Sequence, residues 1–217
     1  VQELLALVRK FNPELAAAAL DTEAAIAKII PAGSLDDPMV NVTRDQGFRQ
    51  TLSTVSQEFP LWGKLGLRED VAAATARATR GQQDSVQTQL EERLKTAFAQ
   101  YYAADRAIAV TKDIHGLLHA IADTARARYA QGIVNQSDVI RADLEEARLD
   151  TELAKLEQSR DSAKARINAL IARRADAPLA RPTSLRKVPA VSALPLPVLV
   201  AKARDRNPKL AAARAEI

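Results

Sequence analysis

Tyr129-Ala-Gln-Gly-Ile-Val-Asn-Gln-Ser-Asp138 is the one break that we expect in a proline-free run from Leu61 to Ala177. Glycine suits the C′ position that ends a helix, so Gly132 predicts where a first helix stops. Asn135 or Ser137 can cap the next helix, with Asp138 in its first turn. Because proline inside a helix costs about 3 kcal/mol, the run predicts two long helices, over 62–130 and 136–175, with a tip near 130–137.

A helix over 62–130 is about 100 Å long at 1.5 Å per residue, too long to pack inside a globule of 217 residues. Residues that are mostly small or apolar recur along it every seven positions in two columns, as in a coiled-coil seam: Leu90, Ala97, Ala104, Thr111, Leu118 and Ala125, with Leu94, Tyr101, Ile108, His115, Ala122 and Tyr129. A flanking stripe of Val110, Ile114, Leu117 and Ile121 predicts a further neighbour. We expect a mainly α fold of very long antiparallel coiled-coil helices; for the individual residues, an ordinary hairpin core is the simpler interpretation.

Composition excludes several function classes. Without cysteine there is no disulfide, thiol nucleophile or Cys-ligated metal, and two histidines and seven glycines leave little for a triad or a Gly-rich nucleotide fold. The net charge is +4, but the basic and acidic residues alternate along the helices, so we expect no nucleic acid. Neighbouring carboxylates such as Glu91 and Glu92 point apart on a helix, so we expect neither catalysis nor a cofactor.

No signal peptide precedes Val1, so we expect a mature or trimmed chain.

The segment before the long helices changes character at Pro31. Asn12-Pro13 opens a predicted helix, with Asn as its N-cap, that runs to about Ile30 within a helical segment 1–31. Met39–Thr43 then alternates with period two, Thr51–Ser56 is rich in β-formers, and Asp45-Gln-Gly47 supplies a turn. The sequence predicts a short β-hairpin within 32–60. Its strands approach the roughly 9–11 residues of a tilted transmembrane strand, although the hairpin taken alone favours a soluble interpretation.

An internal repeat links the two ends of the chain. Residues 12–18, Asn-Pro-Glu-Leu-Ala-Ala-Ala, match residues 207–213, Asn-Pro-Lys-Leu-Ala-Ala-Ala, after a Pro-rich linker over 176–197. A short Ala-rich match can arise by chance, but both copies share a helix–Asn-Pro–helix pattern. We therefore expect residues 198–217 to begin a second structural repeat, and the chain to be about half of a duplicated protein.

These motifs, in this order, resemble the TolC family of outer-membrane efflux ducts. The motifs are Asn12-Pro-Glu-Leu15, Ser56-Gln-Glu-Phe-Pro-Leu-Trp-Gly-Lys64, Tyr129 and Gly132 with Asp138-Val-Ile-Arg-Ala142, and Ile167-Asn-Ala-Leu170. The stretches Pro60–Arg68 and Asp36–Met39 resemble the heavy-metal and cation-efflux branch. The hairpin is shorter than the family leads us to expect.

The resemblance implies a homotrimer whose chains share a β-barrel in the outer membrane of a Gram-negative bacterium and an α-barrel across the periplasm. It implies that 1–31 lie on the equatorial to membrane side, that 32–60 form a barrel segment, and that 61–175 form the periplasmic helical hairpin. Its partners would be a resistance–nodulation–division (RND) pump in the inner membrane, a periplasmic adaptor (membrane fusion protein) and the lipid of the outer membrane. The duct would export cations or small toxic compounds passively. The alternative is a non-catalytic periplasmic coiled-coil scaffold or adaptor-type interaction protein.

Two groups of residues are candidate sites. The tip would present a partner-binding surface on a rigid helical hairpin, with an ordinary αα-turn as the alternative: Arg128, Tyr129, Gly132, Ile133, Val134, Asn135 and Asp138. His115 and His119 lie four residues apart on one helix face, with Asp123 a turn further, a spacing that a zinc site can use. Gly116-Leu-Leu lies between the histidines instead of a metalloprotease glutamate, so structural histidines are the preferred interpretation and we assign no metal.

Overall fold

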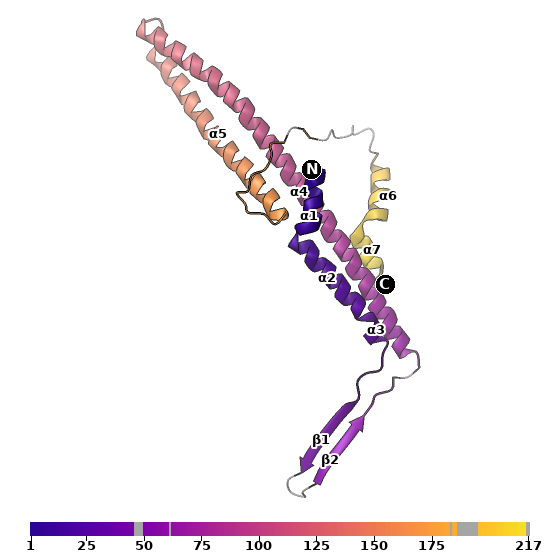
Figure 1. Cartoon of the computed structure of the whole chain (residues 1–217). Helices are drawn as coiled ribbons and strands as arrows, with labels where there is room; N and C mark the ends of the chain where they lie inside the picture. Colours follow the sequence, from indigo (N-terminus) through magenta and orange to yellow (C-terminus); the bar gives the residue numbers. More distant parts are fainter. Residues whose placement is uncertain (46–49, 61, 183, 186–194, 216–217) are drawn as a thin grey trace. The chain divides into compact units, whose positions relative to one another are not determined.

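The computed structural model describes residues 1–45, 50–60, 62–182, 184–185 and 195–215. Its elements follow the chain in the order α1 (Gln2–Phe11), α2 (Pro13–Ala27), α3 (Ile29–Ala32), β1 (Met39–Asp45), β2 (Gln50–Ser56), α4 (Lys64–Ala130), α5 (Gln136–Leu170), α6 (Leu196–Arg206) and α7 (Pro208–Ala215) (Figure 1). The predicted mainly α fold, with two long helices and one short hairpin, is confirmed. Across the described residues, no helix combines the length and apolar content needed to cross a membrane.

The chain divides into two compact units. The first comprises residues 1–12 and 88–193, and the second comprises residues 13–87 and 194–217. Helix α4, with 67 residues, contributes to both.

In the first unit, α5 runs antiparallel beside the later part of α4. Helix α1 lies close to the point at which this later part of α4 begins (Figure 1). The core follows the predicted seam: the buried side chains on α4 are Leu90, Leu94, Ala97, Tyr101, Ala104, Ile108 and Ala122. Ala163 and Ile167 of α5, Ile171 just after it, and Leu5 and Val8 of α1 also belong to this core. The seven-residue spacing therefore identified the face of α4 that packs, because it keeps small and apolar side chains on one side of the helix.

The same pair of helices is poorly buried towards its tip. Between residues 109 and 160, Ala122 is the single fully buried residue. Seam positions such as Thr111, His115 and Leu118 are half-buried, whereas the flanking Val110, Ile114, Leu117 and Ile121 are exposed. The second neighbour predicted for this stripe stays a prediction.

Two helix ends differ from the sequence-based expectation. Helix α5 ends at Leu170, not at 175, because Ala172 adopts a left-handed conformation with φ of 55°. The backbone N–H of Arg173 then donates to the Asn168 carbonyl at 2.8 Å, and buried Asn168 donates its side-chain amide to the carbonyls of Ala175 and Ala177. The predicted helix 13–30 is interrupted after Ala27, since Pro31 has no N–H to donate to the carbonyl four residues earlier.

In the second unit, the early part of α4 lies beside α2 and α7 (Figure 1). A Cβ built on Gly81 of α4 would lie 2.9 Å from the Cβ of Ala212 in α7, so the two helices approach closely at this glycine. β1 and β2 pair antiparallel from Met39 opposite Ser56 to Asp45 opposite Gln50. The predicted strands are confirmed, and most of the predicted turn Asp45-Gln-Gly47 lies outside the described residues.

The helix–Asn–helix pattern is present at both ends of the chain. Asn12, between α1 and α2, has φ −72° and ψ 122°, and Asn207, between α6 and α7, has φ −78° and ψ 113°. Asn207 accepts a hydrogen bond from the Lys209 backbone N–H at 3.0 Å, as a capping residue does. The sequence repeat therefore corresponds to a repeat of local structure.

Candidate functional site

The tip of the long helical hairpin is a helix end closed by glycine. Gly132 has φ of 73° and donates its N–H to the Tyr129 carbonyl at 2.9 Å, and Ile133 donates to the Arg128 carbonyl at 3.0 Å. This pair of bonds is a Schellman motif, which needs a left-handed residue at Gly132. The predicted C′ glycine is confirmed, and it turns the chain towards Asn135, the N-cap residue of α5.

The predicted tip residues lie on this turn and on the helix ends beside it. Ile133 and Tyr129 are exposed, with 65% and 46% of their surfaces accessible, and Val134 is half-buried. Arg128 lies in the last turn of α4 and Asp138 in the first turn of α5, where their charges complement the helix dipoles. The tip thus offers two exposed apolar side chains between a cation and an anion, a composition suited to contact with a protein.

The two histidines lie side by side but face different partners. Their rings stack with centroids 6.5 Å apart and planes within 6°. His115 Nε2 lies 3.1 Å from Asp150 Oδ1, and His119 Nδ1 lies 2.6 Å from Glu146 Oε1, so each histidine pairs across to α5. Within the described residues, no group of three or more histidines, aspartates or glutamates is arranged to hold a metal ion.

A cluster of charges surrounds His119. Arg126 contacts Asp123 and Asp143 at 2.7 and 2.6 Å and Glu146 at 3.4 Å, while His119 Nε2 lies 3.6 Å from Asp123. The hydrogen bond to Glu146, followed by the charge of Asp123, raises the pKa of His119 above its ordinary value. Protonated His119 therefore strengthens the contact between α4 and α5, whereas the neutral ring loses the charge-assisted part of it.

Sequence reasoning missed the acidic partners on α5. A signal for them exists once Gly132 is taken as the turn, because an antiparallel pair is nearly symmetric about it. His119 lies 13 residues before Gly132 and Glu146 lies 14 after it, and for His115 and Asp150 the separations are 17 and 18. Lys112 and Glu157, 3.5 Å apart, also pair between the helices, but they lie 20 residues before and 25 after Gly132 and depart from this symmetry. Exposed ion pairs contribute roughly 0–1 kcal/mol each to stability. The α4–α5 helical hairpin is therefore held together near its tip by weak ion pairs and few buried side chains.

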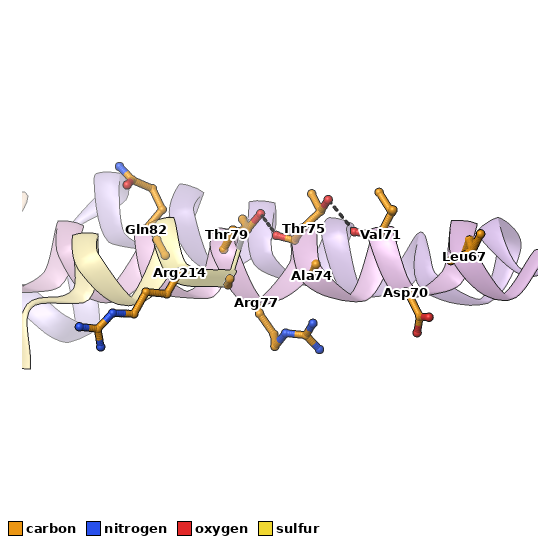
Figure 2. A pocket seen from close by; sticks show the side chains of 12 residues that line it. Leu67, Asp70, Val71, Ala74, Thr75, Arg77, Thr79, Gln82 and Arg214 are labelled. Atoms are coloured by element: carbon orange, nitrogen blue, oxygen red, sulfur yellow. Dashed lines mark hydrogen bonds between the residues drawn. The ribbon is translucent and has the colours of Figure 1, made fainter. Parts of the chain in front are cut away.

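A groove runs along the early part of α4 in the second unit. Figure 2 shows Leu67, Val71, Thr75 and Gln82 along α4, with Arg214 of α7 at one end. Its volume is about 810 Å³, and it is an open channel between helices rather than a closed cavity. The Thr75 and Thr79 hydroxyls donate to carbonyls one turn earlier, at 2.9 Å, so both threonines are engaged within α4. Among the described residues that line the groove, the charged ones are Asp70, Arg77 and Arg214.

Comparisons with known proteins converge on one fold. Residues 4–173 match the family model described as outer membrane efflux protein. Among solved structures, the outer membrane protein VceC from Vibrio cholerae has 17% identity and a TM-score of 0.77, over 99% of this chain and 55% of that chain. The outer-membrane channel OprN has 19% identity and a TM-score of 0.76, over 99% and 52%. CusC has 15% identity and a TM-score of 0.61, over 99% and 53%.

The chain therefore spans about half the length of the solved structures that it matches. At these identities the likeness shows the fold alone. No curated protein sequence matches the chain.

Proposed function

Because the chain belongs to the outer membrane efflux protein family, we propose that it is the N-terminal half of a TolC-type duct, a passive channel for export. The protein belongs to the outer membrane and periplasm of a Gram-negative bacterium. Its cargo would be cations or small toxic compounds, as the resemblance of Pro60–Arg68 to the heavy-metal branch implies. An inner-membrane RND pump would drive the transport, and the duct itself would not catalyse.

One observation carries this proposal: α4 bears a second apolar seam that nothing in the described chain covers. Val110, Ile114, Leu117 and Ile121 are between 47% and 69% exposed and follow the 4–3–4 spacing of a coiled coil. The buried seam of α4 meets α5, so the exposed seam needs a partner on another side. Burying one such side chain fully contributes about 1.5–3 kcal/mol. Copies of the chain, arranged as a homotrimer around a tunnel, would supply that burial.

The β-hairpin supports a duct over the alternative of a periplasmic scaffold, because a scaffold needs no strands. We propose residues 32–60 as a segment of the shared barrel in contact with outer-membrane lipid. Residues 1–31 would lie on the equatorial to membrane side and 61–175 would cross the periplasm. The Pro-rich linker 176–197 would lie in the equatorial region, and 198–217 would begin the second repeat.

The tip would bind the periplasmic adaptor. Tyr129 and Ile133 are exposed at the end of a turn fixed by Gly132, so a partner can approach them without rearranging the helices. Arg128 and Asp138 flank them with opposite charges and would orient the partner.

Site-specific crosslinking tests this proposal. The chain has no cysteine, so Ile133→Cys carries the only thiol of the chain for a photoactivatable maleimide in cells that express the adaptor and pump. We expect Ile133→Cys to crosslink to the adaptor. Glu152→Cys, exposed on α5 about four turns from its start, is the matched control and should not. Equal crosslinking from both positions, or none from Ile133→Cys in cells with an assembled pump, would contradict the proposed docking.

A further inference from the structure

The net positive charge of the chain is concentrated in one short segment. Residues 158–182 contain six basic and two acidic residues, a net charge of +4 that equals the net charge of the whole chain. Outside this segment, 25 bases and 25 acids cancel. Residues 112–157, the outer part of the α4–α5 hairpin, have the opposite sign, with six bases and nine acids. Such a separation of charge bears on what the surface attracts and not on the fold.

The six bases lie on the end of α5 and on the segment that follows it, within the first unit. We call them the basic patch: Arg160, Lys164, Arg166, Arg173, Arg174 and Arg181. The side chains of Arg174 and Arg181 are 87% and 82% exposed, and Arg166 and Arg173 are exposed as well. Most of these charges are therefore available to a ligand in solution.

The segment after α5 is fixed to both long helices. Buried Asn168 of α5 donates its side-chain amide to two carbonyls of the segment, at 3.1 and 2.9 Å. The segment passes beside α4 (Figure 1), where the Tyr101 hydroxyl donates to the Leu179 carbonyl at 3.5 Å and Asp105 lies 4.0 Å from Arg181. The arginines therefore extend from a fixed backbone, which lowers the conformational entropy lost when they bind a ligand.

Three carboxylates compensate part of the basic patch. The pairs are Arg160 with Asp161, Arg174 with Asp176 and Arg181 with Asp105, at 3.1, 3.1 and 4.0 Å. The hydrogen bond from Arg174, with the charge of Lys164 as a weaker cause, lowers the pKa of Asp176. Six bases thus face three acids. Because the pair of Arg174 and Asp176 is exposed on both sides, the carboxylate of a ligand can replace Asp176 at little cost.

We propose that the basic patch binds the carboxylates of peptidoglycan. This inference rests on the proposed function, which assigns the segment after α5 to the periplasm. A single exposed ion pair is weak, so the patch suits a polymer that presents many anionic groups at once. Arginine binds a carboxylate through two parallel N–H bonds, as Arg174 binds Asp176 at 3.1 Å for both bonds. Peptidoglycan is a polymer of the periplasm, and its stem peptides carry free carboxylates at regular intervals.

The surroundings of the basic patch favour this polymer over an anionic membrane surface. A protein surface that lies on a membrane combines basic residues with exposed apolar side chains that enter the lipid. The large apolar side chains of residues 160–182 are instead buried or half-buried: Ile167, Leu170, Ile171 and Leu179. A hydrated glycopeptide needs no apolar contact, so charge alone is enough for it.

Sedimentation with purified peptidoglycan sacculi tests the proposal. The full-length protein in mild detergent is mixed with sacculi, and the bound fraction is measured after centrifugation. The patch variant combines Arg173→Gln, Arg174→Gln and Arg181→Gln, and we expect it to bind at least about tenfold more weakly than the parent. Sacculi whose carboxylates have been converted to neutral amides should not retain the parent protein.

The matched control removes the same charge from the outer part of α5. It combines Arg141→Gln, Arg148→Gln and Lys155→Gln, all at exposed positions, and should bind sacculi as the parent does. Because the substitutions of both variants are exposed, both proteins should melt with the parent. If the patch variant does not fold, the comparison of native with amidated sacculi still decides the proposal, since it uses the parent alone.

The outcomes separate this inference from the proposed function. A parent protein that does not sediment with sacculi, an equal loss of binding in both variants, or full binding to amidated sacculi would each overturn the inference. Binding to phosphatidylglycerol vesicles in place of sacculi would overturn it as well and would assign the patch to anionic lipid. In all these cases, three copies in native mass spectrometry would leave the proposed duct intact. A full-length protein that fractionates with the cytoplasm would overturn both proposals.

Discussion

Replacing Gly132 by alanine should destabilise the helical hairpin, although the new methyl group meets no neighbour. Gly132 has φ of 73°, and a Cβ built on it has nothing within 4 Å, so the cost comes from the backbone alone. A left-handed conformation costs an L-residue about 1–2 kcal/mol. Alanine also restricts the unfolded chain, which offsets about 0.4–1 kcal/mol. We expect a net loss of about 1 kcal/mol, which is about fivefold in the folding equilibrium.

Gly116→Ala is the matched control for this substitution. Gly116 lies inside α4, and a Cβ there also has nothing within 4 Å, but its φ is not positive. The same glycine-to-alanine change should therefore stabilise the helix, by up to about 1 kcal/mol. Urea unfolding followed by helical ellipticity gives both free energies. A Gly132→Ala protein that is as stable as the parent, or an equal effect at both sites, would refute the turn described for the tip.

Three further predictions concern other parts of the first unit. Ala172→Gly should raise the free energy of unfolding by about 0.5–1 kcal/mol, since glycine tolerates the φ of 55° at the end of α5; an unchanged urea midpoint would argue against that conformation. Leu94→Ala should cost about 2–5 kcal/mol because Leu94 is completely buried, whereas exposed Leu117→Ala should change stability by under about 0.5 kcal/mol in the isolated chain. His119→Gln should lower the melting temperature relative to the parent at about pH 5.5 and not at about pH 8.5. Because the folded state raises the pKa of His119, the protonated ring stabilises the fold below about pH 6.5, and this stabilisation is lost as the pH rises through the folded pKa. Equal melting-temperature differences at both pH values would contradict the pairing of His119 with Glu146.

Much of the helical architecture could be predicted from the sequence because it follows from local rules. Proline is absent from 61–177, glycine stands at the C′ position, and small residues recur every seven positions. The length of α4, the turn that ends it and its packed seam could therefore be predicted. The end of α5 was missed because Ala172 takes the left-handed role that glycine usually fills. No residue type in the sequence indicates that alanine will replace glycine in this position. The left-handed turn depends on Asn168, whose side-chain amide binds two carbonyls of the segment that follows.

The candidate site was only partly predictable for a related reason. The tip residues are contiguous in sequence, so locating the turn located them. The partners of the histidines are about 30 residues away and depend on the register of α4 against α5, which a heptad pattern does not fix. Glu146 lies midway between Val139 and Leu153, seven residues from each, so it interrupts an apolar column of α5, and its pairing with His119 explains that interruption.

The exposed seam of α4 is tested most directly by counting the copies in the native particle. Native mass spectrometry of the full-length protein, extracted from outer membranes in mild detergent, gives that number without further modification. If copies of the chain cover Val110, Ile114, Leu117 and Ile121 around a tunnel, the particle contains three, and Leu117→Glu shifts it to single copies. A parent protein that is monomeric at concentrations where it remains folded and membrane-extracted would contradict the account.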